Sequence, residues 1–468
     1  MRRQSFLRTP NIWRVGLIPL AMVGSLAAGA SPLAALIVGG AVVTSALGIA
    51  FLQNPAWALY AAIFLMFLPK GLIPNDTYGI LQSRSIQLAL LLALLSWLLY
   101  AAFHRRRIVW VSTSLLMAGF LMWGVITLFW APSLLLGRRE LVPYAMGLVL
   151  LLLIVNEIDS LQTLDGLMST LALNGWVLVL AGIGTILSQG YEAGTRLGVL
   201  GMNKNEFGVL LIVTMSGVLW HALRSSKRQR ALRMSLSVIF ILLALILVAL
   251  SGSRGGAISL LATLVVFWFW KPTRSWGKLG LLILALAAVS APFIFSTTLD
   301  RFAEDATGGL GGRLVIWQAT RLLILDHPWR GVGIGHASHA VMSHVGMLMS
   351  LEGRERIAIH NPVLAIWAET GTPGLLLYLG VLGSAVWLFV RQYSLNRTGV
   401  RSLTSYFALM SCLFAGYMLS WIKGGGMALA PSYYLLLALL LIPSRLDIEG
   451  LEHIAERDVQ DAGQAFCL

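Results

Sequence analysis

Histidine and arginine side chains gather between residues 297 and 374, the one long interruption in an almost continuous series of apolar segments. This stretch holds five of the eight histidines, and His360 is followed directly by Asn361-Pro362. A proline just inside a helix start and a glycine past its end predict a short helix from Pro362 to Thr370. The positive end of that helix and nearby arginines favour a neutral imidazole at His360, which can act as a general base. A histidine that only caps the helix fits the spacing equally well.

A second helix is predicted earlier in the same stretch. Arg313, Trp317 and Arg321 follow one another at i, i+4 and i+8, which places them on one face of a helix. The pair His327-Pro328 should end this helix, because proline disfavours helical geometry in the residue before it. Guanidinium groups on such a face can hold a phosphate by bidentate contacts.

Two further arginines lie in turns upstream. Arg254 falls within the small-residue run Ser251–Gly256, at a membrane edge where a charge is costly unless it is paired. Arg196 belongs to a polar segment that also holds Asn203 and Asn205. The small-residue run fits close helix packing equally well, and the asparagines fit either helix capping or binding of sugar hydroxyls. Any one arginine fits a solvated or snorkelling charge, but the group favours an anionic ligand such as pyrophosphate.

The remaining histidines do not predict a metal site. His336, His339 and His344 follow no known zinc spacing, and no cysteine or carboxylate is placed to complete such a site. The run from Gly331 to Gly335 resembles a nucleotide loop only superficially, because it lacks the strand-turn-helix context and a Walker lysine. We interpret this run as a flexible turn and expect neither a metal nor another cofactor.

Composition places these residues in a membrane protein. The chain has 468 residues, of which 57% are hydrophobic and 12% charged, whereas charged residues make up about a quarter of soluble domains. Apolar runs of about 17 to 25 residues match the thickness of a bilayer. The net charge of +14 is explained by basic loops that set topology, so nucleic acid is not an expected partner. The two cysteines form no disulfide framework.

The apolar runs predict an all-α polytopic integral membrane protein with about 12 to 14 transmembrane helices and one long periplasmic loop. Basic clusters fall in alternate loops, which places both termini in the cytoplasm and the long loop outside. The expected parts are a transmembrane scaffold with short periplasmic loops (1–296), a partly helical, catalytic periplasmic loop (297–372), C-terminal transmembrane helices (373–443) and a cytoplasmic tail (444–468). Ala28-Gly29-Ala30 resembles a signal-peptide cleavage site, but an uncleaved first helix is favoured.

Several short motifs resemble the O-antigen ligase and O-antigen polymerase superfamily of bacterial envelope glycosyltransferases. They cover roughly residues 190 to 390 and are Gly201-Met202-Asn203-Lys204-Asn205-Glu206-Phe207-Gly208, Ser253-Arg254-Gly255-Gly256, Gly312-Arg313 with Trp317, His327-Pro328 with Gly331-Val332-Gly333, and His360-Asn361 with Glu369-Thr370-Gly371-Thr372-Pro373-Gly374. The likeness is greatest to the O-antigen ligases, which join surface polymer to lipid A-core. Lys204 departs from the pattern, because a less charged residue is expected between the asparagines.

The resemblance implies a GT-C-like, inverting, metal-independent glycosyltransferase of the bacterial inner membrane with a periplasmic active site. Its donor would be a glycan on undecaprenyl pyrophosphate, and its acceptor a sugar hydroxyl of lipid A-core. His360 would be the base, and Arg254, Arg313, Arg196 and Arg321 would bind the pyrophosphate. Asn203, Asn205, Asn361 and Trp317 would contact sugar more weakly.

Other functions fit the sequence less well. An O-antigen polymerase usually has two large outer loops, and a protein O-oligosaccharyltransferase has a larger C-terminal soluble region. A lipid-linked glycan flippase or transporter would carry ionisable residues inside its spans and an internal repeat, and neither pattern is evident. We therefore expect Arg196, Arg254, Arg313 and His360 to converge in one outward-facing cavity.

Overall fold

The structure is a computed structural model that describes residues 48, 50, 51, 53–69, 80–189, 197–200, 202–271, 273–275, 278, 282, 310–345, 356–396, 401–423 and 430–446. Every regular element in these ranges is a helix. The helices are α3 Pro55–Met66, α4 Ile80–Phe103, α5 Ser112–Thr127, α6 Leu134–Glu157, α7 Leu161–Gln189, α8 Lys204–Leu223, α9 Lys227–Leu250, α10 Arg254–Phe269, α13 Leu310–Asp326, α14 Ala337–Val345, α15 Pro362–Leu395, α16 Arg401–Lys423 and α17 Pro431–Leu441, followed by a 3-10 turn at Ile442–Ser444.

The helices form the all-α polytopic membrane protein that the sequence predicts. Within the described ranges, seven helices are long and apolar enough to cross a bilayer, and four shorter apolar helices accompany them. Leucines on the outside of α4, such as Leu91, are exposed, whereas α8 is buried along most of its length. Three of the apolar runs that we expect to span the membrane, near residues 13–31, 33–52 and 276–296, lie wholly or largely outside the described residues, so the total number of spans stays a prediction.

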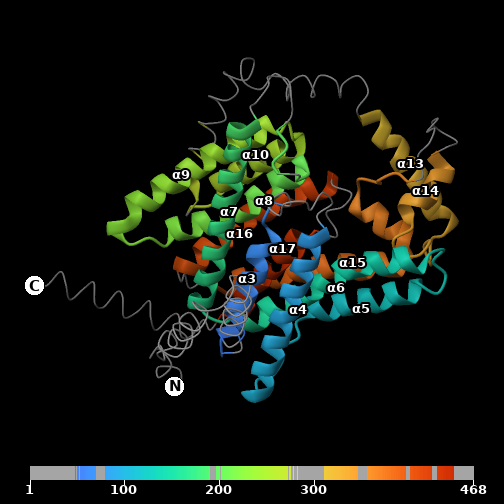
Figure 1. Cartoon of the computed structure of the whole chain (residues 1–468), viewed down its shortest axis with the longest axis horizontal. Helices are drawn as coiled ribbons and strands as arrows, with labels where there is room; N and C mark the ends of the chain where they lie inside the picture. The colour runs from blue at the N-terminus through green and yellow to red at the C-terminus, as the bar shows by residue number, and fades with distance from the viewer. Residues whose placement is uncertain are drawn as a thin grey trace, which may run out of the picture.

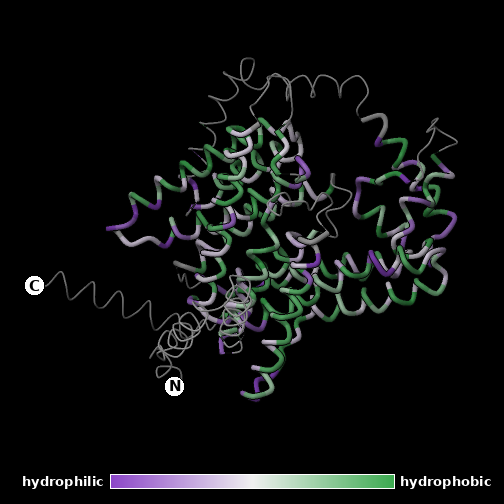
Figure 2. Tube along the Cα trace, viewed as in Figure 1, coloured by the Kyte–Doolittle hydropathy of each residue, from purple (hydrophilic) through white to green (hydrophobic). Residues whose placement is uncertain are grey.

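Consecutive crossings give the bundle two distinct ends. Because α6, α7, α8 and α9 each have the length of a span, the starts of α6, α8 and α10 lie at one end, which we call the loop end. The arginines that precede α5 and those around the start of α9 lie at the other, which we call the basic end. Figures 1 and 2 show the hydrophilic ends of α4 and α9 at the lower edge and the left edge, with α13 and α14 opposite them at the upper right.

Glycines let the central helices approach closely. A Cβ atom on Gly256 of α10 would lie 3.5 Å from the Cα atom of Gly208 in α8, so these two backbones touch. Gly217 of α8 sits against the backbone of α7, where a Cβ atom would lie 2.2 Å from the carbonyl oxygen of Met168. Small residues at such crossings allow the backbone contact that packs helices in membranes. The run Ser251–Gly256 therefore does serve helix packing.

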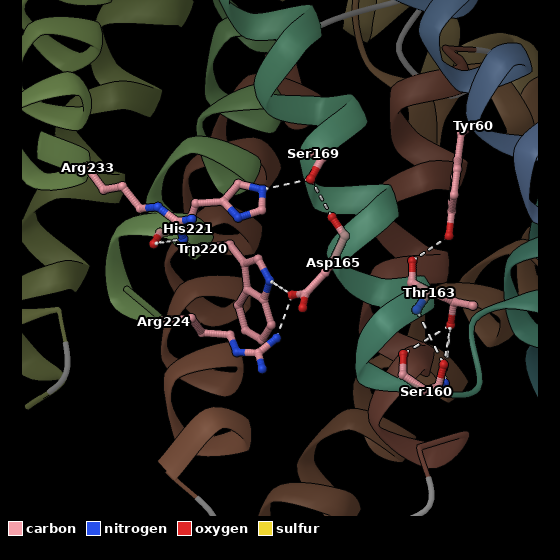
Figure 3. Close-up of polar contacts among 9 residues, drawn as sticks. All are labelled: Tyr60, Ser160, Thr163, Asp165, Ser169, Trp220, His221, Arg224 and Arg233. Carbon is pink, nitrogen blue, oxygen red and sulfur yellow. Dashed lines mark hydrogen bonds and ion pairs between the residues drawn. The ribbon is translucent and has the colours of Figure 1, made fainter. Parts of the chain in front are cut away.

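A polar cluster fastens α7 to α8 at the basic end (Figure 3). The Asp165 carboxylate accepts a hydrogen bond from Trp220 Nε1 at 2.7 Å and forms an ion pair with Arg224. One turn along α7, Ser169 Oγ lies 3.0 Å from His221 Nε2 and donates to the Asp165 carbonyl oxygen. The Trp220 side chain is fully buried, so this partner removes the cost of an unsatisfied N–H group.

Candidate active site

His360 lies immediately before the first turn of α15. The Asn361 side chain, not the His360 side chain, caps the helix, because Asn361 Oδ1 accepts a hydrogen bond from Leu364 N at 3.1 Å. His360 itself has a left-handed backbone with φ of 54°, a conformation that is uncommon outside glycine. The imidazole is half-buried and free of the capping role that the sequence left open.

Helix α13 brings Arg313 and Trp317 to His360. Trp317 Nε1 donates to the carbonyl oxygen of Ile359 at 2.9 Å, which fixes the backbone beside His360. Burial, and then the positive charge of Arg313, hold the pKa of His360 below its ordinary value. Both causes disfavour the imidazolium ion. The imidazole is therefore neutral near pH 7 and has a lone pair to accept a proton.

Arg321 shares the helix with Arg313 but not its surroundings. The predicted helix is present as α13, and it ends at Asp326, directly before His327-Pro328. Arg313 is partly buried, whereas Arg321, two turns later, is exposed. An interaction of Arg321 with pyrophosphate stays a prediction.

The upstream motifs form a second group at the loop end. Asn203 caps α8 by accepting a hydrogen bond from Asn205 N at 2.9 Å. Ser253 caps α10 and also donates through Oγ to Asn205 Oδ1 at 2.9 Å. Two segments almost fifty residues apart are thus joined by side chains from both motifs. These hydrogen bonds explain why Asn203 and Asn205 are present in the structure. Binding of sugar by the two asparagines stays a prediction.

Two of the four residues expected to converge cannot be placed. Arg196 lies outside the described residues, and so does the side chain of Arg254, whose backbone starts α10. In Figure 1, α13 lies at the upper right and α10 at the upper centre, so the two helices are not side by side. The structure brings Arg313 and Trp317 to His360, and Asn205 to Ser253. Convergence of all four side chains stays a prediction.

The run from Gly331 to Gly335 has a defined fold, so its interpretation as a flexible turn is wrong. Its three glycines have φ values between 67° and 94°, which other residues rarely adopt. We call residues 328–337 the glycine segment. Ile334 N donates to Thr127 Oγ1 at 3.2 Å, and a Cβ atom on Gly333 would lie 2.7 Å from the Cα atom of Ala131. The segment therefore packs directly on the turn between α5 and α6.

A break in α15 supplies the other side of this contact. Gly371 has non-helical angles (φ 65°, ψ −173°), and Pro373 has no N–H group for the Glu369 carbonyl. The carbonyl oxygens of Ala368 and Glu369 instead accept hydrogen bonds from Val332 N and Gly333 N, each at 2.9 Å. The glycine segment thus satisfies the backbone groups that the break leaves open.

Glu369 strengthens the same contact through its side chain. The carboxyl group is buried and accepts hydrogen bonds from the backbone N–H groups of Gly335 and Ala337, at the start of α14. Glu369 belongs to a motif of the sequence, but the sequence predicts no role for it. Its partners are backbone N–H groups, which leave no pattern of residue types.

Two histidines of the loop have structural partners. His336 is buried, and its Nε2 accepts a hydrogen bond from Ser133 N at 2.9 Å. Its Nδ1 therefore carries the proton and donates to the Ile334 carbonyl oxygen at 2.9 Å. His344 Nε2 lies 2.8 Å from the Asp326 carboxylate. These contacts attach the loop to the bundle and α14 to α13.

Comparison with known proteins shows which part of the chain is similar to a described family. Residues 238–379 match the family model described as O-antigen ligase. A solved structure described as "Structural coordination of polymerization and crosslinking by a peptidoglycan synthase complex" is 21% identical, with 71% of this chain and 97% of that chain covered at a TM-score of 0.39. That TM-score is too low to support an argument. A search of curated proteins finds no match.

The matched range contains Arg313, Trp317, His360 and the glycine segment, together with the first turn of α10. Over these residues the chain is similar to O-antigen ligases. The predicted resemblance to the O-antigen ligase superfamily is thus confirmed, and residues 238–379 carry it in this chain.

Proposed function

We propose that this protein is an inverting, metal-independent glycosyltransferase that moves an O-antigen glycan from undecaprenyl pyrophosphate to a sugar hydroxyl of lipid A-core. The reaction takes place at the periplasmic face of the bacterial inner membrane, with both termini in the cytoplasm. The observation that carries the proposal is the half-buried position of His360 beside Arg313 at the start of α15, where burial and then the Arg313 charge lower the pKa of the imidazole.

His360 accepts the proton of the acceptor hydroxyl while that oxygen attacks the anomeric carbon of the donor sugar. A new glycosidic C–O bond forms, and the bond from the anomeric carbon to the pyrophosphate oxygen breaks. The bonding electrons leave with undecaprenyl pyrophosphate, and the configuration inverts. A positioned base of this kind contributes about 10²- to 10⁴-fold in rate.

Arginines stabilise the negative charge that develops on the departing pyrophosphate. Arg313 lies beside the base, and Arg254 and Arg196 are assigned to the same ligand on the strength of the motifs. Fixed cations aimed at developing charge commonly supply the largest catalytic contribution. Asn203, Asn205, Asn361 and Trp317 are weaker candidates for sugar contacts, since their described hydrogen bonds are to the protein itself.

The test is glycan transfer by purified His360→Ala from a lipid-linked donor to each acceptor in turn. We expect a rate at least about 10²-fold lower, with donor binding retained. His327→Ala is the matched control, because His327 is exposed at the end of α13 and should leave the rate unchanged. Full activity of His360→Ala with every acceptor would exclude His360 as the base.

The acceptor used by the unmodified protein separates the related activities. Transfer to lipid A-core supports the ligase, and transfer to a second lipid-linked glycan would make the protein a polymerase. Transfer to a protein hydroxyl would make it a protein O-oligosaccharyltransferase. Movement of lipid-linked glycan across vesicles without transfer would favour a flippase.

A further inference from the structure

The backbone of His360 adopts a left-handed conformation although the residue has a side chain. Its φ of 54° is positive, and a Cβ atom makes this region of backbone angles costly for any residue other than glycine. Such a conformation persists only where the surrounding structure fixes it, and it is found most often at functional sites. Contacts on both sides of His360 must therefore hold it.

The peptide group that precedes His360 is held by α13. Its oxygen atom is the Ile359 carbonyl oxygen, which accepts the hydrogen bond from Trp317 Nε1 at 2.9 Å. The same peptide group contains the nitrogen about which φ of His360 rotates, so the hydrogen bond fixes one side of that rotation. The Ile359 side chain is buried in a small core that also contains Ala319 and Ala368, and Trp317 packs against this core.

The chain is also fixed on either side of that peptide group. Upstream, Ile357 N donates to the Ser338 carbonyl oxygen of α14 at 2.9 Å. Downstream, Asn361 caps α15 by accepting a hydrogen bond from Leu364 N at 3.1 Å. The torsion angles of His360 have to join these two fixed segments, and they determine the direction of the imidazole.

We propose that Trp317 is a positioning residue, whose hydrogen bond to the Ile359 carbonyl holds His360 in the left-handed conformation and so aims the imidazole at the acceptor hydroxyl. The inference rests on the proposed function, in which His360 is the base. It gives Trp317 a role other than contact with sugar. An indole has a single donor, and that of Trp317 is already engaged by the Ile359 carbonyl.

The role predicts which kinetic constant depends on Trp317. A base is effective only where its lone pair reaches the proton that it removes. The hydrogen bond joins two groups of the protein itself, so it orients His360 before substrate arrives. Its loss should slow the chemical step and leave substrate binding unchanged.

The experiment measures glycan transfer from an undecaprenyl pyrophosphate-linked donor to lipid A-core by full-length Trp317→Phe. Phenylalanine keeps an aromatic ring at the core but has no N–H group. Trp367→Phe is the matched control, because Trp367 packs against the same core and its Nε1 donates to Thr372 Oγ1 at 3.2 Å rather than to the backbone beside His360.

We expect kcat of Trp317→Phe to fall about 10- to 10²-fold, with KM for both substrates unchanged, whereas Trp367→Phe should keep the kcat of the unmodified protein. The acid limb of the kcat/KM profile should move to higher pH. An imidazole released from its position is less buried, and burial is the main cause that lowers the pKa of His360. A smaller fraction of folded protein would lower kcat without moving this limb.

The same substitution in a His360→Ala background separates the positioning role from the proposed function. A residue that acts only through His360 has no effect once the imidazole is removed, so Trp317→Phe should leave the residual rate of His360→Ala unchanged. An unchanged kcat in the parent background, an equal loss in both backgrounds or a higher KM would overturn the positioning role alone. Full activity of His360→Ala would overturn the base and the positioning role together.

Discussion

At His360, burial and the Arg313 guanidinium act in the same direction, since both favour the uncharged imidazole. The effect is useful to a base, because a histidine with a lowered pKa stays unprotonated in mildly acidic medium. Trp317 acts on the backbone rather than on charge, through its hydrogen bond to the Ile359 carbonyl.

Replacing Arg313 by glutamine removes the second of the two causes. We expect the pKa of His360 to rise toward its ordinary value, so that the acid limb of the kcat/KM profile moves to higher pH. The measurement is the rate of glycan transfer as a function of pH. Arg321→Gln is the control, because Arg321 is exposed on the same helix, whereas Arg313 is the charge that lowers the pKa of His360. An equal displacement in both variants would contradict the assignment.

At the scale of elements, the break in α15 is what joins the loop to the bundle. Gly371 is essential to it, since a Cβ atom there would lie 2.1 Å from the Trp329 carbonyl oxygen, in a backbone with positive φ. Backbone strain of this kind costs about 1–3 kcal/mol, and the steric clash adds to it.

Gly371→Ala should therefore lower the melting temperature and separate the glycine segment from α15. Gly383→Ala is a matched control on the same helix, because a Cβ atom at Gly383 meets nothing within 4 Å. This change should be neutral or stabilising, by up to about 1 kcal/mol. Thermal unfolding in detergent compares the two. Equal melting temperatures would show that the break does not depend on glycine.

The polar cluster that joins α7 to α8 through Asp165 and Trp220 allows a second test at this scale. Asp165→Ala leaves the buried Trp220 N–H without its partner, which costs about 1–3 kcal/mol. In a Trp220→Phe background the same change should cost much less, because the N–H group is already gone. A double-mutant cycle of unfolding free energies measures the difference. Additive effects would mean that the two side chains do not interact.

The sequence predicts elements that are marked by residue type. His327-Pro328 marks the end of α13, Pro362 the start of α15, and Ser251–Gly256 a close helix crossing. It does not predict the glycine segment, whose hydrogen bonds join main-chain atoms far apart in the chain. Glycines at 331, 333 and 335 are compatible with a flexible turn and with a tightly packed one. The segment is tightly packed because it binds the break in α15 at Gly371, thirty to forty residues later in the chain.

The site is predicted in part for the same reason. A helical face holds Arg313 and a helix start holds His360, and both are local patterns that the sequence shows. The approach of the two residues is seen only in the structure. Glu369 binds backbone N–H groups, and Asp165 meets Trp220 across two helices. Neither pairing has a spacing that could be recognised in the sequence.

For the whole molecule, the membrane character follows from apolar runs and is confirmed by the helices. The sidedness follows from charge alone and stays a prediction. The structure shows that the starts of α6, α8 and α10 lie together at the loop end. One labelling experiment therefore tests on which side of the membrane all three helix starts lie.

A membrane-impermeant maleimide applied to intact spheroplasts distinguishes the two ends. In a Cys467→Ser background, Ser343→Cys on α14 should react, because the loop end is expected outside. Ser226→Cys, before α9, should react only after permeabilisation. Both serines are exposed, so the comparison is balanced. The reverse pattern would invert the topology.

The loop is attached in part through main-chain atoms, with consequences for how such proteins diversify. The hydrogen bond from Val332 N to the Ala368 carbonyl oxygen requires no particular side chain, although the Val332 side chain also packs on the small core that contains Ala368. The glycines at 331, 333, 335 and 371 are constrained strongly. A loop from another sequence that preserves this glycine spacing could be grafted onto the same bundle. New acceptors could then be acquired by exchanging the loop while the transmembrane scaffold is kept.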